Sequence, residues 1–313
     1  MLLTWGGLGC DEREPPPTPP PEIQRPSPRP SGAREETRLE ESVEALRRTN
    51  ARAYLPPSAA ESELYRNWVG HLATSAMEGH LPTEKAPEGF VGRWLDRGRI
   101  WLLAEETERN RGAGAVALRI AVGAEIIVEI PHSFFDEGTL PIGLTVFEEL
   151  DARALLVNTV HRGGTGPEPE RLERARSGTS ESDVAHQISS FFHQAHLELG
   201  RAWPRAQVVQ LHGFRDEKVP TAKIIVSAAG TGAATAPLAR ALNDAFGVGT
   251  ARLYPEEVQQ LGGTENVQAR ANAAESRPFL HIEIAASLRN QMQRQKSLRD
   301  RFARALALGL AVP

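Results

Sequence analysis

Three scarcities in the sequence narrow the classes of protein to which this chain can belong. It has a single cysteine, Cys10, so no disulfide can form within the chain. No apolar run in it approaches the roughly 18 residues that a membrane-spanning helix needs. The formal net charge is only −4, without the basic excess of a typical nucleic-acid-binding protein, so we expect no nucleic-acid partner.

Two familiar catalytic signatures are also missing. No G-x-S-x-G motif occurs, which argues against a serine hydrolase of the α/β-hydrolase type. The glycines around Thr231 lack the lysine and the spacing of a phosphate-binding loop. With 313 residues and 40% hydrophobic residues, the chain is nevertheless long and apolar enough for a large folded domain.

The N-terminal part is expected to be a leader and a spacer. Residues 1–10 end in Leu8-Gly9-Cys10 and resemble a short bacterial lipoprotein signal, whose cysteine becomes lipidated. Gly7 stands where such signals carry an apolar residue and no basic segment precedes it, so an incidental thiol remains the alternative. Nine of the sixteen residues from Pro15 to Pro30 are proline, which makes 11–37 a stiff linker. We therefore expect export to a bacterial cell envelope, lipid-anchored or periplasmic.

Residues 38–313 are expected to form one α/β domain with an N-terminal elaboration over about 38–122. In the elaboration, helices are predicted at 39–50 and 59–80, and a hairpin at 99–103 and 113–122. Further strands are predicted at 126–130, 154–158, 207–211, 223–228, 251–254 and 279–284, and helices at 140–150, 183–199, 235–246 and 286–308. The last helix is expected to expose a basic face, and 163–182 to be a loop or lid. This alternation predicts a mixed, mainly parallel sheet with helices on both faces.

Polar residues follow several of the predicted strands. His132, Asp136 and Glu137 come after 126–130, Arg162 after 154–158 and His212 after 207–211, while Glu283 lies within 279–284. Because ligands of α/β sheets bind outside the carboxyl ends of the strands, we expect these side chains to meet. Two imidazoles and one carboxylate can hold one Zn²⁺ ion and leave a position open. A second carboxylate can move the proton, and an arginine can bind a substrate carboxylate.

The segments IPHSFFDE, NTVHR, VVQLHG and HIEI, in this order, resemble the zinc carboxypeptidase superfamily, with the N-formylglutamate amidohydrolase and poly-γ-glutamate hydrolase-like branch nearest. The resemblance covers roughly residues 99–290 and implies a zinc carboxypeptidase-like fold. It implies that His132 and His212 are metal ligands, that Glu283 is the general base and acid, and that Arg162 binds a carboxylate. For the acidic ligand it implies Glu137, in an H-x4-E pattern, with Asp136 as the competitor.

These expectations combine into a predicted function and its alternatives. The chain is predicted to be a zinc-dependent hydrolase of amide bonds in peptide-like, glutamyl or N-acyl amino acid substrates, small or polymeric, that carry a free carboxylate. The same site would serve another bond, such as an ester. The remaining alternative is a non-catalytic metal- or ligand-binding envelope lipoprotein with the same fold.

Overall fold

The computed structural model describes residues 38–48, 54–80, 85–106, 109, 111–178 and 180–311. The predicted lipoprotein signal, the lipidated Cys10 and the linker 11–37 lie outside these ranges and stay predictions. Within the described residues no helix is long and apolar enough to cross a bilayer. All the elements described below fall into one compact unit, Glu36–Pro313.

A nine-stranded sheet runs through the described part of the chain, in the order β1-β2-β3-β5-β4-β6-β9-β7-β8. The strands are β1 Phe90–Leu95, β2 Ile100–Glu105, β3 Ala115–Arg119, β4 Ala124–Ile130, β5 Ala152–Val157, β6 Gln207–Phe214, β7 Ile224–Ser227, β8 Ala251–Tyr254 and β9 Phe279–Ala285. The central run β5-β4-β6-β9 is parallel, as is β7 with β8. The N-terminal strands and the β7–β9 pair are antiparallel.

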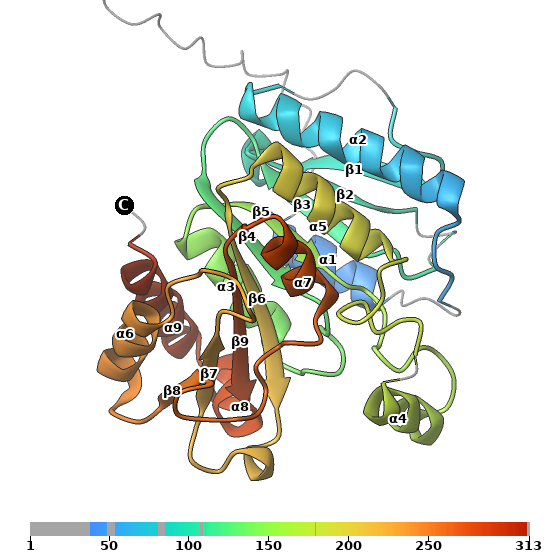
Figure 1. The fold of residues 1–313 in the computed structure, drawn as a ribbon. Coiled ribbons are helices and arrows are strands. Elements are labelled where there is room, and N and C mark those ends of the chain that lie inside the picture. Colours follow the sequence, from blue (N-terminus) through green and yellow to red (C-terminus); the bar gives the residue numbers. More distant parts are fainter. Residues whose placement is uncertain are drawn as a thin grey trace, which may run out of the picture. The chain divides into compact units, whose positions relative to one another are not determined.

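Helices cover both faces of this sheet (Figure 1). They are α1 Leu39–Arg48, α2 Ala59–Met77, α3 Thr139–Glu149, α4 Glu168–Ser177, α5 Phe191–Ala202, α6 Ala236–Phe246, α7 Val267–Ala274, α8 Ala286–Arg294 and α9 Lys296–Gly309. One apolar layer joins the sheet to α1, α3, α6, α8 and α9, and the other joins it to α2, α5 and α7. Successive strand residues alternate between the layers, as Val128 and Ile127 of β4 do. The predicted α/β fold class is confirmed.

Three predicted elements differ from the structure. The segment 163–182, predicted to be a loop or lid, contains the helix α4, which projects from the body (Figure 1). Two residues of the segment signal this helix: Pro169 lies in its first turn, and Gly178 follows its end in the left-handed region at φ 69°. The helix expected from 183 starts only at Phe191, because the Ser190 side chain caps it. The long final helix is two helices, α8 and α9, with Gln295 in extended conformation between them.

The sequence prediction also missed two elements, β1 and α7.

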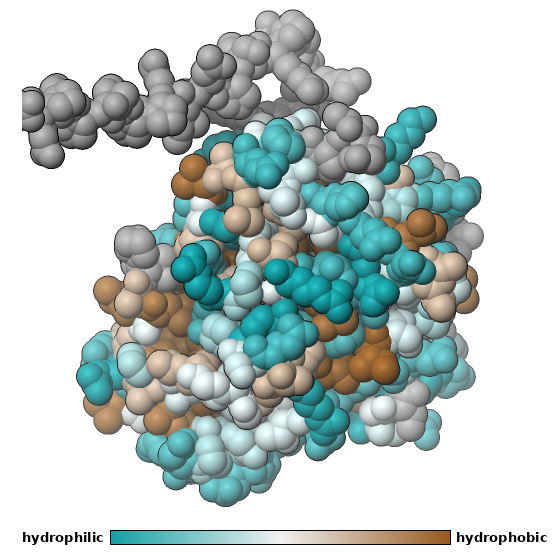
Figure 2. Space-filling model, turned by 45° about the horizontal axis from the view of Figure 1, so that its top comes forward, coloured by the Kyte–Doolittle hydropathy of each residue, from teal (hydrophilic) through white to brown (hydrophobic). Residues whose placement is uncertain are grey.

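On the surface, exposed apolar side chains occur at separate places in the chain, for example Leu64, Met77 and Leu308. The face shown in Figure 2 accordingly has small hydrophobic areas separated by hydrophilic ones. Scattered exposed apolar residues of this kind are ordinary for a folded domain.

One buried histidine of α5 leads to a prediction about stability. Burial, and then the neighbouring His196, lower the pKa of His193 to about 3, whereas an unfolded histidine titrates near 6.5. The unfolded chain therefore takes up the proton first, and stability present above pH 6.5 is lost as the pH falls toward 3. In zinc-free protein we expect His193→Gln to weaken this acid destabilisation by about 1.4 kcal/mol per pH unit between pH 6 and 4.

Urea unfolding of the parent and of His193→Gln at several pH values, with a chelator present, measures this difference. Other histidines with lowered pKa values contribute to the pH dependence of both proteins and cancel in the comparison. Parallel stability–pH curves for the two proteins would contradict the prediction.

Candidate metal centre

The polar residues that the sequence places at strand ends lie at one edge of the sheet. His132 follows β4, His212 lies near the end of β6, and Glu283 lies in β9. These three strands are parallel neighbours, and His212 pairs in register with Glu283. All three side chains line one cavity of about 1600 Å³.

The turn after β4 decides which of the two neighbouring acids joins the imidazoles. The backbone N–H groups of Phe135 and Asp136 both donate to the carbonyl of His132, at 3.0 and 2.8 Å. This is one helical turn, and it brings residue i+4 over residue i on the same side. Asp136 therefore lies against His132 and is buried, whereas Glu137 at i+5 is exposed. The carboxylate beside the imidazoles is that of Asp136, and not that of Glu137, which the resemblance implied.

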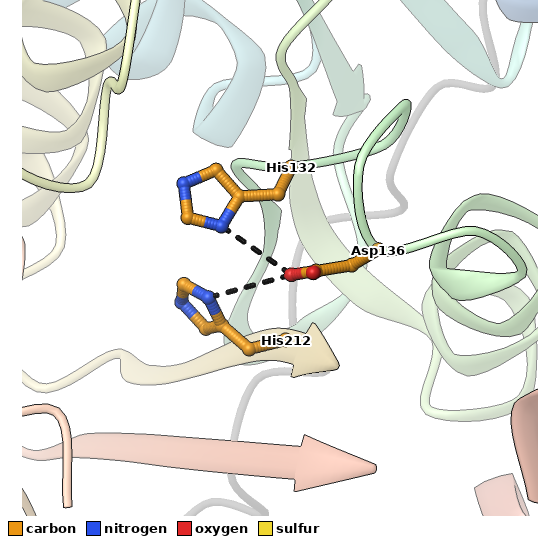
Figure 3. Close-up of side chains that lie close together, drawn as sticks. All are labelled: His132, Asp136 and His212. Atoms are coloured by element: carbon orange, nitrogen blue, oxygen red, sulfur yellow. Dashed lines mark ion pairs between the residues drawn. The ribbon is translucent and has the colours of Figure 1, made fainter. Parts of the chain in front are cut away.

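His132, Asp136 and His212 form a cluster that could hold one metal ion (Figure 3). Asp136 Oδ2 lies 3.3 Å from His132 Nδ1 and 3.8 Å from His212 Nδ1, and one donor atom from each residue lies within 4.8 Å of the others. Tetrahedral bonds of about 2.0–2.1 Å would separate two ligands of Zn²⁺ by about 3.3 Å. His132 Nδ1 is also buried and has no hydrogen-bond partner among the described residues, so the donor set and its spacing fit a zinc ion.

Asp183 orients the first imidazole, and the sequence prediction missed it. Its Oδ1 lies 2.8 Å from His132 Nε2, and Arg162 donates to its Oδ2. Burial alone would raise the pKa of Asp183, but His132, His186 and Arg162 outweigh it and hold the pKa below its usual range. With Asp183 ionised, Nε2 of the neutral His132 ring carries the proton and Nδ1 is left for a cation, the usual support for a metal-binding histidine.

His212 differs from His132 in its electrostatic surroundings. Burial, and then His281 and His132, lower the pKa of His212 well below its ordinary value. For His132, burial also acts to lower the pKa, but Asp183 and Asp136 reverse the balance and raise it. His212 is therefore neutral, as a metal-binding imidazole has to be.

Glu283 lies beside the cluster with one oxygen uncommitted. Its Oε1 lies 3.3 Å from His281 Nε2, and its Oε2 is buried with no hydrogen-bond partner in the described part of the chain. The ring of His281 in turn packs 4.4 Å from that of His212, centroid to centroid. An unpartnered buried carboxylate oxygen is costly in an apolar strand, so this atom is a candidate for chemistry in the cavity.

Arg162 lines the same cavity from the segment after β5. Its guanidinium donates to Asp183 and lies over the ring of Phe135, 5.1 Å from the centroid. Burial, and then Arg171 and Arg162, lower the pKa of the adjacent His161 to about 4, so His161 is neutral at pH 7. The positive charge on this wall of the cavity comes from the arginines.

Arg289 ties together the three chain segments that carry the cluster. The sequence placed it on a solvated basic face, but it is buried between α8 and the strand ends. Its guanidinium donates to the carbonyls of Glu137, Phe214 and Ile284, in the turn after β4, in β6 and in β9. Burial lowers its pKa. This one side chain therefore fixes the spacing between Asp136, His212 and Glu283.

No protein-family model and no curated protein matches the chain. Among solved structures, it is similar to an N-formylglutamate amidohydrolase from Ralstonia eutropha JMP134, with a TM-score of 0.39 and 16% identity over 63% of this chain and 97% of that one. It is also similar to metallo-carboxypeptidases from Pseudomonas aeruginosa and Burkholderia cenocepacia. Their TM-scores are 0.35 and 0.31, with 14% and 13% identity over 83% and 82% of this chain and 69% and 70% of theirs.

With identities of at most 16% and TM-scores of at most 0.39, this likeness concerns the fold alone. A function has to be inferred from the side chains that line the cavity.

Proposed function

We propose that this protein is a zinc-dependent hydrolase of amide bonds in peptide-like or N-acyl amino acid substrates that carry a free carboxylate. The observation that carries the proposal is the juxtaposition, in one cavity, of the His132–Asp136–His212 cluster and the uncommitted carboxylate oxygen of Glu283. A metal-binding protein without turnover needs the cluster but has no use for that second carboxylate.

His132, Asp136 and His212 are the residues that would hold the ion. Bound there, Zn²⁺ would supply a Lewis acid that polarises a carbonyl and makes water nucleophilic at neutral pH. The protein contributes the fixed orientation of the ligands: Asp183 holds the ring of His132, and the helical turn after β4 holds Asp136.

Glu283 is proposed as the group that moves the proton. Glu283 lines the cavity, and none of the described residues hydrogen-bonds to its Oε2, so its carboxylate can take a proton from the attacking water and deliver it to the nitrogen of the leaving amine. The contact of Oε1 with His281 Nε2 holds the carboxylate in one rotamer. Burial of both residues keeps bulk water from competing for that proton.

Arg162 is proposed to bind the free carboxylate of the substrate. Its contact with Asp183 and its packing on Phe135 fix the guanidinium at the cavity wall, and a planar guanidinium suits a carboxylate. We expect Arg162→Ala to raise KM for a substrate with a free carboxylate by about 10–100-fold, as the loss of a charged hydrogen bond of about 1.5–3 kcal/mol implies. For the methyl ester of the same substrate we expect little change.

The comparison between acid and methyl ester separates direct binding of the substrate carboxylate by Arg162, the carboxylate clamp, from an indirect effect through Asp183. Loss of the contact between Arg162 and Asp183 would act on both substrates equally. His186→Ala removes another contact of Asp183 and serves as the control for that indirect effect. An equal rise in KM for acid and ester would rule out the carboxylate clamp.

Metal content and a substrate panel test the proposed function as a whole. Purified full-length protein is analysed for zinc and assayed on peptides, γ-glutamyl compounds, N-acyl amino acids and the corresponding esters, before and after chelation. We expect about one zinc per chain and an activity that chelation abolishes and zinc restores. A zinc-loaded protein without turnover on any amide would favour the non-catalytic binding protein, and turnover of esters alone would move the proposal to another bond.

A further inference from the structure

A chain of buried polar side chains leads from His212 into the apolar layer under α5. Gln210 lies two residues before His212 on the same face of β6, and it pairs in register with Glu129 of β4. Both are fully buried, as is His196 of α5, whose Nδ1 lies 2.7 Å from Glu129 Oε1. Burying a carboxylate in an apolar layer costs free energy unless it is hydrogen-bonded. The hydrogen bonds of Glu129 therefore indicate which side chains it holds in place.

The side-chain amide of Gln210 is fixed from two sides. Its Nε2 donates to Glu129 Oε2 at 2.8 Å, and its Oε1 accepts from Asn266 Nδ2 at 2.6 Å. Rotating the amide by half a turn would set its carbonyl against the carboxylate of Glu129 and its NH₂ against the NH₂ of Asn266. Both contacts would then be repulsive, so only one orientation satisfies the two neighbours.

Asn266 cannot rotate to accommodate a flipped Gln210. Its Oδ1 caps the N-terminus of α7 by accepting from the backbone N–H groups of Gln268 and Ala269, at 2.9 and 3.0 Å. Its NH₂ group is therefore committed to Gln210. The orientation of Gln210 thus rests on a buried carboxylate at one end and on a helix cap at the other.

This orientation determines the proton of His212. Its Nε2 lies 2.6 Å from Gln210 Oε1, an atom that can only accept, so Nε2 must carry the proton. Nδ1 then presents its lone pair toward Asp136. We propose that Glu129 and Gln210 are positioning residues that lock His212 in the tautomer that binds the metal through Nδ1, a role that rests on the proposed metal site.

The two imidazoles of the cluster are thus oriented by different means. His132 donates directly to the carboxylate of the fully buried Asp183. His212 donates to the neutral amide of Gln210. The carboxylate that fixes this amide belongs to Glu129, which also contacts His196. Outer partners of metal-binding histidines are worth about 10–100-fold in metal affinity. We call the hydrogen-bonded series Glu129–Gln210–His212 the relay; in it, the supporting carboxylate acts on the imidazole through an intervening amide.

Two variants test the relay. Gln210→Met keeps the length of the side chain but removes the acceptor, so we expect a mixture of His212 tautomers and a zinc affinity about 10–100-fold weaker. The exchange Glu129→Gln with Gln210→Glu swaps the amide and the carboxylate. Residue 210 still accepts from His212 and Asn266, and residue 129 now donates to it. We expect this double variant to regain the parent tautomer and a zinc affinity within about threefold of the parent, because the hydrogen bonds to His212, Asn266 and residue 129 are kept and only the 3.4 Å contact of Gln210 with Gln268 Oε1 is lost.

The tautomer is measured in zinc-free protein from ring ¹⁵N shifts of labelled histidine, with His212→Gln for assignment, and zinc affinity by competition with a chromogenic chelator. Gln207→Met, on the same strand and outside the relay, is the matched control, and circular dichroism verifies folding. A parent protein with His212 protonated at Nδ1, or a folded Gln210→Met variant with the parent tautomer and affinity, overturns the relay. So does a folded double variant without the Nε2–H tautomer. A parent that binds no zinc overturns the proposed function, while the tautomer still decides the relay.

Discussion

Replacing Asp136 by asparagine is expected to remove the bound metal, and replacing Glu137 by glutamine is expected to leave it in place. The two changes are matched, because each removes one negative charge and keeps the shape of the side chain. Only Asp136 lies against both imidazoles, at 3.3 and 3.8 Å from their Nδ1 atoms, whereas Glu137 is exposed. An amide is a poor ligand for Zn²⁺, so the loss in affinity should exceed the roughly 10–100-fold that an outer partner contributes.

Zinc content by mass spectrometry, together with chelator competition, measures both variants against the parent. We expect about one zinc per chain in the parent and in Glu137→Gln, and none after dialysis in Asp136→Asn. Loss of zinc in Glu137→Gln with retention in Asp136→Asn would mean that the turn after β4 rearranges when the metal binds, so that Glu137 replaces Asp136 beside His132. Retention of zinc in both variants would rule out a ligand from this turn.

The positions of His132, His212 and Glu283 could be predicted because they depend on a general rule. The segments before and around them read as short apolar strands, and parallel strands end at the same edge of a sheet. The register of His212 with Glu283 in adjacent strands is the structural form of that rule. Local hydrophobic patterning was enough to place these three residues at one edge, together with other polar residues such as His161 and His281, and the motif resemblance singled them out as site residues.

The choice between Asp136 and Glu137 depended on backbone geometry that composition does not encode. Both acids follow the same strand, and only the hydrogen bonds to the His132 carbonyl decide which one turns inward. Asp183 was missed for a related reason. It was assigned to the start of a helix that in fact begins at Phe191, which leaves Asp183 free to reach His132.

Arg289 and Gln210 were out of reach for a different reason. A basic residue in an amphipathic helix is usually solvated, and nothing in the pattern of 286–308 marks Arg289 as buried. Gln210 lies within an apolar strand and carries no charge. Both matter through contacts between segments far apart in the sequence, such as the contact of Arg289 with the Glu137 carbonyl, and such contacts appear only once the chain is folded.

Replacing Glu283 by glutamine is expected to lower kcat by about 10²–10⁴, the usual contribution of a general acid–base group, with the zinc content unchanged. An amide at position 283 fits the same space and can still accept from His281 Nε2. It cannot take up a proton from water and return it to the leaving nitrogen. Because Glu283 is not one of the three clustered ligands, the metal should stay, and KM should change little.

Glu265→Gln provides the matched control, since Glu265 is a second carboxylate on the wall of the same cavity and pairs with Arg270 at the surface. We expect it to turn over like the parent. Steady-state kinetics on the best amide substrate, with zinc measured in the same samples, separates loss of chemistry from loss of metal. If Glu283→Gln keeps its zinc and its kcat, proton transfer must come from another group in the cavity.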